Sequence, residues 1–277
     1  MHTINPALEA EYNNRALVPE HPAIFDRWRQ ASSLFRSGAQ STLDLPYGPA
    51  ERHRLDLFHA PDARGTVVFI HGGYWRSLDK SDFSFVAAPF VEHGLSVVAI
   101  NYRLCPAASV AEVVEDCREA MCWLVRHGTQ HGVPVDRIAL TGHSAGGHLV
   151  AMLLATDWRA RNIDPSRIVG GAALSGVFDL QPLLDCSMNG DLRLASAAEA
   201  RAVSPIHHAP FVTAPLYLAV GADESAAFQA QTRLLQRAWP KVCHNVDEVP
   251  ASNHFTIVDR FVQADSRGLQ FVEGLFR

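Results

Sequence analysis

The chain has 277 residues, of which 48% are hydrophobic and 19% are charged, a composition that excludes a disordered chain, a coiled coil and a small disulfide-stapled domain. Lys and Arg total 24 against 29 Asp and Glu, and this net charge of −5 offers no basic field to attract nucleic acid or an anionic membrane. A chain of this length can bury roughly three quarters of its unfolded surface. We therefore expect one domain over residues 1–277.

The lack of a recognisable targeting or membrane-spanning segment, together with the cysteine usage, predicts a soluble, cytoplasmic protein. The N-terminus lacks the basic start and apolar run of a signal peptide. The longest apolar run, residues 149–155, is far shorter than the roughly 20 residues that cross a bilayer. The five cysteines are odd in number and show no C-x-x-C spacing, which is typical of free thiols in a reducing compartment.

The first 60 residues precede the regular pattern. Residues 1–40 are polar and helix-like, and we expect an N-terminal helical arm. Aromatic residues such as Tyr12 and Trp28 are its candidate anchors, and the arm could either cover a pocket or pack on the surface. Residues 53–59 alternate between apolar and polar side chains, which predicts an antiparallel edge strand.

From residue 66 onward, short apolar runs alternate with amphipathic helical patterns. Apolar strands that alternate with helices predict an α/β fold with a mostly parallel sheet covered on both faces. Ligands of such sheets bind at the carboxyl ends of the strands. The pattern fails over about 176–210, which contains several prolines and is expected to be a small cap-like insertion. The expected strands are 66–70, 95–101, 138–141, 168–174, 216–221 and 246–249, and the expected helices are 83–91, 110–125 and 146–155.

The strongest motif is Gly142-His143-Ser144-Ala145-Gly146, a G-x-S-x-G sequence between an expected strand and an expected helix. A serine hydroxyl is a poor nucleophile until a base takes its proton, and a sharp strand-to-helix turn lifts that hydroxyl clear of the sheet. The helix start leaves the N–H of Ala145 free to face developing negative charge. The motif predicts Ser144 as a nucleophile, whereas the alternative is a glycine-rich turn with a buried serine.

A second glycine-rich loop, His71-Gly72-Gly73-Tyr74-Trp75, follows the first expected parallel strand. Acyl transfer needs N–H donors where an oxyanion forms, and glycines allow the backbone to approach a substrate. We therefore expect the N–H groups of Gly73 and Tyr74 to join that of Ala145 as oxyanion donors. His71 is expected to anchor the loop, and Tyr74 and Trp75 either stack on an aromatic substrate or simply pack beneath the cap.

The general base must be a histidine, and the sequence offers 14 of them. His254 follows the last expected strand, which makes it the strongest candidate. His207 and His208 lie in the insertion and remain weaker alternatives, while His148 is expected to pack behind the serine. No H-E-x-x-H pattern or spaced His and Cys set predicts a metal site.

The acid that orients this histidine is expected after the strand at 216–221, where two carboxylates are adjacent. We favour Glu224, three residues after the strand-ending Gly221, and keep Asp223 as the alternative. The resulting order of serine, acid and histidine along the chain is the order that α/β-hydrolases use.

Together these motifs resemble the α/β-hydrolase branch that contains arylformamidases (kynurenine formamidases) and related esterases. The resemblance covers nearly the whole chain. One departure is the acid, since many arylformamidases have Asp where Glu224 stands here. Tyr74 also stands where many related esterases have a third glycine, which favours short acyl groups. The segments that carry the resemblance are 71–75, 142–146, Asn101–Pro106, Ser175–Leu180, Val203–Pro205, Val220–Ser225, His254–Phe255 and Glu11–Arg15.

The resemblance implies a serine hydrolase that cleaves short-acyl carboxylic esters or aryl formamides and that needs no cofactor or metal. Its triad would be Ser144, Glu224 and His254, and Gly72, Trp75 and His143 are further candidates for the substrate pocket. A general short-chain carboxylesterase without a role in kynurenine metabolism and a non-catalytic ligand receptor on the same fold are the alternatives. The expected partner is a small-molecule ester or amide, and the oligomeric state stays open, with a homodimer among the possibilities.

Overall fold

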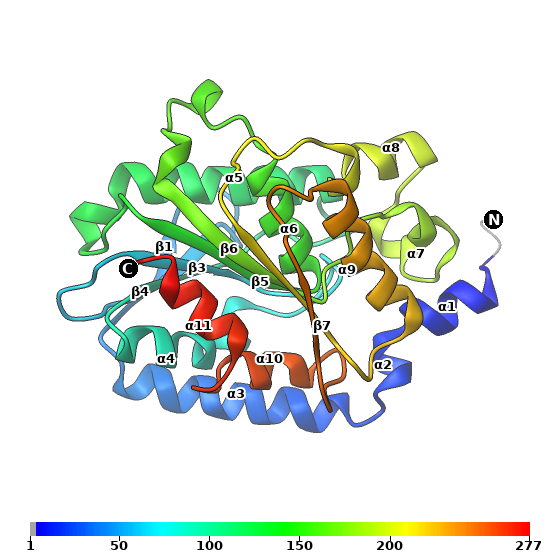
Figure 1. Cartoon of the computed structure of the whole chain (residues 1–277), viewed down its shortest axis with the longest axis horizontal. Helices are drawn as coiled ribbons and strands as arrows, with labels where there is room; N and C mark the ends of the chain where they lie inside the picture. The colour runs from blue at the N-terminus through cyan, green and yellow to red at the C-terminus, as the bar shows by residue number, and fades with distance from the viewer. Residues whose placement is uncertain (1–3) are drawn as a thin grey trace.

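The computed structural model describes residues 4–277, so the first three residues of the expected arm lie outside the described part. One eight-stranded sheet runs through the molecule in the order β1-β2-β4-β3-β5-β6-β7-β8 (Figure 1). The pairs β1–β2 and β2–β4 are antiparallel, and all other neighbours are parallel. The strands are β1 Ser41–Pro46, β2 Arg54–Phe58, β3 Thr66–Ile70, β4 Ser96–Ile100, β5 Ile138–His143, β6 Ile168–Leu174, β7 Leu216–Gly221 and β8 Val246–Val249.

Helices cover both faces of this sheet. Successive side chains of each central strand point to opposite faces, so each strand contributes apolar side chains to a core on either side. In β3, Val68 and Ile70 join the core beneath α5, α6 and α9, whereas Val67 and Phe69 join the core beneath α3, α4, α10 and α11. Figure 1 shows the sheet between these two layers. The expected α/β fold is thereby confirmed. The helices are α3 His21–Gly38, α4 Ala87–Glu92, α5 Val110–His127, α6 Ala145–Leu154, α9 Ala226–Ala238, α10 Thr256–Phe261 and α11 Arg267–Gly274.

The expectation of an edge strand at 53–59 is wrong in one respect. β2 is antiparallel, but it lies between β4 and an unexpected edge strand, β1. Its polar residue Asp56 is buried, not solvent-facing, because it pairs with Lys80 at 2.8 Å and accepts a hydrogen bond from the backbone of Asp44. The edge strand escapes detection because Asp44 has a φ of 56° and the apolar Leu43 is exposed.

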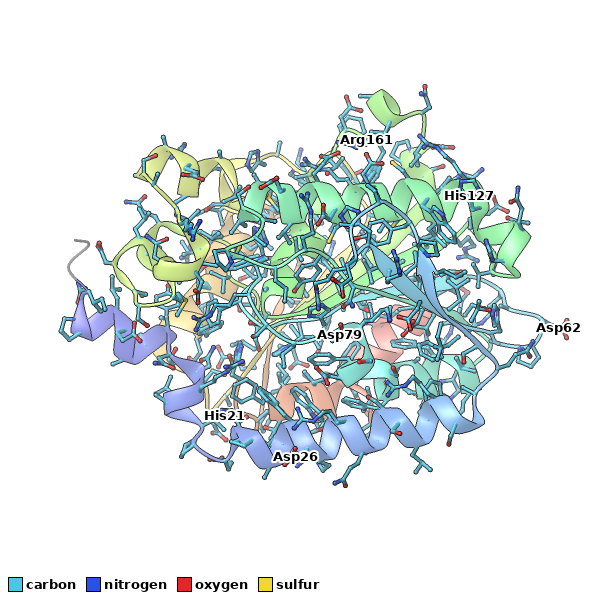
Figure 2. All side chains as sticks on the ribbon, turned by 180° about the vertical axis from the view of Figure 1, so that it is seen from behind. His21, Asp26, Asp62, Asp79, His127 and Arg161 are labelled. Atoms are coloured by element: carbon cyan, nitrogen blue, oxygen red, sulfur yellow. The ribbon has the colours of Figure 1, made fainter. Side chains whose placement is uncertain are left out.

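The N-terminal segment forms α1 Pro6–Tyr12, α2 Asn14–Leu17 and the long helix α3. Figure 2 shows α3 along one side of the molecule, with His21 and Asp26 towards its α2 end. The insertion contains the short helices η5 Gln181–Asp185, α7 Asn189–Leu192, α8 Ala197–Ala202 and η6 Pro205–His207. The two segments meet where the Glu9 carboxylate accepts hydrogen bonds from the backbone and hydroxyl of Ser187.

Within residues 4–277, no helix is both long enough and apolar enough to span a bilayer. All five cysteines are free thiols, and each of them is buried.

Candidate active site

Ser144 lies at the sharp turn between β5 and α6. Its backbone adopts φ 56° and ψ −118°, and its N–H donates to the carbonyl of Leu174 at 2.8 Å. The turn brings α6 so close to β3 that a Cβ on Gly146 would lie 1.9 Å from the carbonyl oxygen of Ile70. Only glycine fits there, which explains the second glycine of the motif. The strained turn presents the Ser144 hydroxyl at the carboxyl end of the sheet.

The structure brings Ser144, His254 and Glu224 together. The Nε2 atom of His254 lies 3.0 Å from the Ser144 Oγ, and its Nδ1 atom lies 2.7 Å from Oε2 of Glu224. All three side chains are buried. Each comes from a loop that follows a parallel strand, β5, β7 or β8, and the carboxyl ends of parallel strands share one edge of the sheet.

Of the two adjacent carboxylates, only Glu224 reaches the histidine. Asp223 is exposed, and its side chain has no hydrogen-bond or ion-pair partner within residues 4–277. The second oxygen of Glu224, Oε1, accepts hydrogen bonds from the Ser175 hydroxyl at 2.5 Å and from the Gly221 N–H at 2.7 Å. Both carboxylate oxygens are therefore satisfied, which fixes the side chain in place.

Ser175 is a site residue for which the sequence analysis assigned no role. It directly follows β6 and adopts φ 50°, like the positive φ of Ser144. Its position after a strand and its place at the start of Ser175–Leu180, a segment that carries the family resemblance, were usable signals, but neither of them predicts a contact with Glu224.

The loop after β3 carries two of the three expected oxyanion donors. Gly73 has a φ of +111°, and a Cβ there would lie 2.2 Å from the carbonyl oxygen of Ser77. This turn leaves the N–H groups of Gly73 and Tyr74, like that of Ala145, without a hydrogen-bond partner anywhere in residues 4–277. Three free N–H groups beside a serine can stabilise a tetrahedral oxyanion.

His71 holds the base of this loop. Its ring stacks on Tyr102 with centroids 4.4 Å apart, and its Nδ1 lies 2.7 Å from the carbonyl oxygen of Gly72. Burial lowers the pKa of His71 to about 4, so the ring is neutral at pH 7. Its neutral ring allows the loop to form without a buried charge.

A cavity with about 570 Å³ of empty space, including its open mouth, adjoins Ser144 and His254. The N-terminal arm, the loop after β3 and the insertion all contribute to its wall. Ser187 and Met188 are the contribution of the insertion. The arm contributes Tyr12, Asn13, Asn14, Arg15, Phe25 and Trp28, and the β3 loop contributes Gly73, Tyr74, Arg76, Ser77 and Leu78.

The three further pocket candidates differ in their placement. His143 lines the cavity, and its Nε2–H donates to the carbonyl of His254 at 2.7 Å. Gly72 lies behind Ser144, because a Cβ there would be 3.1 Å from the Cβ of the serine. Trp75 is fully buried and donates to His148 at 3.2 Å, so the expectation that it forms part of the pocket wall is wrong. The loop sequence around Trp75, with Gly72 and Gly73 before it and Arg76 and Ser77 after it, could not distinguish a packed indole from an exposed one.

A search for groups of three or more His, Cys, Asp or Glu side chains that could hold a metal ion finds none within residues 4–277.

Comparisons with known proteins show which family, relatives and solved structures this chain is similar to. The family described as BD-FAE matches residues 55–168. The kynurenine formamidase of Danio rerio is 31% identical over 240 residues, which are 82% of this chain and 79% of the relative. A provisionally assigned thioesterase from Silicibacter sp. has a TM-score of 0.85 at 30% identity, covering 97% of this chain and 98% of its own. A thermophilic esterase from Thermogutta terrifontis has a TM-score of 0.62 at 25% identity, covering 86% and 90%.

Proposed function

Because the chain belongs to the kynurenine formamidase family of α/β-hydrolases and is a hydrolase of small molecules, we propose that it cleaves short-acyl esters or aryl formamides through an acyl-enzyme on Ser144. The observation that carries the proposal is the continuous hydrogen-bonded line from the Ser144 hydroxyl through His254 to Glu224. A serine, a base and an acid in this order are the elements of nucleophilic acyl transfer.

In the first half of the proposed reaction, the Ser144 Oγ attacks the carbonyl carbon and His254 Nε2 takes the hydroxyl proton. Glu224 accepts the Nδ1–H bond and stabilises the imidazolium that forms. The N–H groups of Gly73, Tyr74 and Ala145 donate to the oxyanion. As the intermediate collapses, the imidazolium gives its proton to the leaving nitrogen or oxygen, which departs as an amine or alcohol.

In the second half, water attacks the acyl-enzyme and gives one proton to His254. The second tetrahedral intermediate forms at the same N–H groups. Its collapse releases the carboxylic acid and returns the proton to the Ser144 oxygen. The scheme uses only groups of the chain and one water molecule per turnover.

The cavity supports a small acyl group and an aromatic leaving group. The Tyr74 side chain stands beside the proposed oxyanion donors, where its hydroxyl donates to the carbonyl of Tyr12 at 2.7 Å. This contact fixes a bulky ring in the cavity wall, which supports a preference for short acyl chains. Trp28, Phe25 and Phe255 add aromatic surface to the same wall, which suits an aryl group.

A substrate panel tests the proposal. We expect kcat/KM for p-nitrophenyl esters to be highest at two to four acyl carbons, since each methylene that fits adds only about 0.8 kcal/mol of burial and one that clashes loses more. We also expect turnover of N-formylkynurenine. Ser144→Ala should remove both activities, while Ser33→Ala on the exposed face of α3 should keep them.

The panel also separates the proposed reaction from its alternative. Fast turnover of short esters without hydrolysis of any formamide would leave a general carboxylesterase and remove the arylformamidase assignment. A maximum at eight acyl carbons or more would contradict the narrow acyl side.

A further inference from the structure

The end of helix α1 touches two of the loops that form the proposed catalytic site. The last four carbonyl groups of a helix have no partner within it. In α1, the carbonyl of Tyr12 accepts a hydrogen bond from the Tyr74 hydroxyl at 2.7 Å, and that of Glu11 accepts one from the Ser225 hydroxyl at 2.7 Å. No backbone N–H in residues 4–277 donates to either carbonyl. Two side chains of the site loops therefore complete the end of this helix.

The first contact acts on the loop that carries the proposed oxyanion donors. Tyr74 and the following Trp75 both have a positive φ, 50° and 55°. This conformation is unfavourable for residues other than glycine, so it persists only where other contacts determine it. The bond from the Tyr74 hydroxyl to the arm is such a contact, and it belongs to a residue whose own N–H is a proposed oxyanion donor. The arm therefore helps to hold this N–H in place.

The second contact acts on the loop that carries the acid. Ser225 directly follows Glu224 and caps the start of α9, where its Oγ accepts a hydrogen bond from the N–H of Phe228 at 3.3 Å. The Glu11 carboxylate accepts a hydrogen bond from the N–H of Ala227 at 2.9 Å, at the positive end of the α9 dipole. The side chain and the carbonyl of one arm residue thus hold the turn between β7 and α9.

The arm also reaches the histidine, through one aromatic side chain of α9. The ring of Tyr12 lies 5.8 Å from that of Phe228, and Phe228 packs edge-on against His254 with centroids 4.5 Å apart. The Tyr12 hydroxyl accepts a hydrogen bond from the Gln231 amide at 2.9 Å, and both side chains are buried. Figure 1 shows α1 next to α9, the helix against which the acid loop and the histidine both lie.

We propose that Glu11 and Tyr12 are positioning residues of the reaction, which hold the oxyanion donor Tyr74 and the acid Glu224 in register with Ser144. The inference rests on the proposed function and adds to it a role for a segment far from the strand ends in the sequence. Both residues act through others, so the loss of their contacts should lower kcat more than it weakens substrate binding. The reason is that a displaced donor or acid affects the transition state more than the bound substrate.

Removal of one hydroxyl tests the oxyanion side. Tyr74→Phe keeps the backbone donor and the aromatic ring but breaks the bond to the Tyr12 carbonyl. We expect kcat for p-nitrophenyl acetate to fall about tenfold, with KM changed by less than about twofold. The control is Tyr47→Phe, which removes an equally short bond from a hydroxyl to a carbonyl, that of Asn101 at 2.7 Å, outside the cavity wall. It should leave kcat unchanged, and an equal loss of kcat in the two variants would overturn the proposal.

Two glutamates on one helix test the acid side. Glu11→Ala should lower kcat about fivefold, and Glu11→Gln should recover most of the loss because its amide oxygen still accepts from the N–H of Ala227. Glu9→Ala is the matched control, since the carboxylate of Glu9 holds the same helix to Ser187 of the insertion and not to a loop of the triad. It should change kcat by less than about twofold. Equal losses in Glu9→Ala and Glu11→Ala would overturn the proposal, because docking of the arm in general would then be sufficient.

A double-mutant cycle separates positioning from a general loss of stability. If Glu11 acts through Glu224, Glu11→Ala should change kcat by less than about twofold in the Glu224→Gln protein, where the carboxylate that it positions is already absent. A double variant whose loss equals the product of the two single losses would contradict action through the acid.

Amide hydrogen exchange follows the same contacts without turnover. Backbone N–H groups within 73–77 and 221–225 form hydrogen bonds in each turn. Tyr74→Phe should speed exchange in the first segment, and Glu11→Ala should speed it in the second. Faster exchange with the kcat of the wild type, or no change in either, would overturn the positioning role and leave the proposed reaction standing. A wild-type protein that turns over no ester or formamide would overturn the proposed function, and this inference with it.

Discussion

Glu224 and Asp223 are neighbours in the chain but lie in opposite environments. The carboxylate of Glu224 is buried and receives hydrogen bonds from Ser175, Gly221 and His254, while Asp223 faces solvent. A buried carboxylate with three donors is held in one orientation, so it can fix the tautomer of the histidine and stabilise its charged form.

Exchange of each carboxylate for its amide tests this difference. Glu224→Gln should lower kcat by about a thousandfold or more with a small change in KM, because the amide cannot stabilise the imidazolium. Asp223→Asn should change kcat by less than about twofold, as expected for an exposed position. Ester hydrolysis by both purified variants, with circular dichroism as a check on folding, provides the comparison. A larger loss in Asp223→Asn would show that the acid is misassigned.

For single residues, the sequence predicts a place in the site only where the residue follows a strand and belongs to a spaced motif. Ser144, Glu224 and His254 could be placed at one edge because each follows an expected parallel strand. Asn14 could not be placed in the cavity, since its approach depends on how the arm packs against the β3 loop. Whether Trp75 faces substrate or core likewise depends on contacts with His148 that no local pattern encodes.

Among the secondary-structure elements, α3 ties the N-terminal arm to the site. Trp28 is 2% exposed, and its ring lies 5.4 Å from Phe25, 5.1 Å from Phe83 and 6.4 Å from Phe255, measured between centroids. Its indole N–H donates to Asp259 of α10 at 2.7 Å. One side chain thus joins α3, the η1 segment (Lys80–Val86) and the loop that carries His254.

Truncation of Trp28 tests the role of this helix. Trp28→Ala should lower the free energy of unfolding by about 3–5 kcal/mol, since it leaves a large cavity in the core. Leu34→Ala, on the same helix at a side chain that is 76% exposed, should change it by less than about 0.5 kcal/mol. Urea unfolding of the two variants measures both values. Similar losses would mean that α3 is not anchored through Trp28.

The elements also differ in how far they can be predicted. The parallel strands β3, β6 and β7 coincide with the predicted apolar runs, because a strand buried on both faces needs an unbroken apolar sequence. The edge strand β1 has no such requirement, and its register shifts between Thr42 and Leu45. A strand with exposed apolar residues and a break in pairing leaves no clear period in the sequence.

For the whole molecule, buried neutral histidines couple folding to pH. Burial lowers the pKa of His71 and of His148 to about 4 and that of His143 well below its usual value. The same groups in an unfolded chain take up protons near pH 6.5. Below that pH the unfolded state binds more protons, so the free energy of unfolding falls as pH falls from 6.5 towards 4. The raised pKa values of Asp56 and Asp82 oppose this in part.

We expect each of these histidines to remove about 2 kcal/mol of stability between pH 7.5 and pH 5. Urea unfolding at pH 7.5 and pH 5 measures the sum. His148→Gln should reduce the difference between the two pH values, whereas His244→Gln, at an exposed position, should leave it unchanged. A free energy of unfolding that is the same at both pH values would contradict neutral burial of the three rings.

The central claim of the account is that Ser144 is the nucleophile. Intact-protein and peptide mass spectrometry after reaction with an aryl alkylphosphonate tests it most directly, because attack by the serine releases the aryl group and leaves a stable phosphonyl ester. We predict one phosphonyl group per chain on the peptide containing Ser144, loss of esterase activity in proportion to labelling, and no label in Ser144→Ala. Inactivation without a label on Ser144, or equal labelling of the Ser144→Ala protein, would contradict the account.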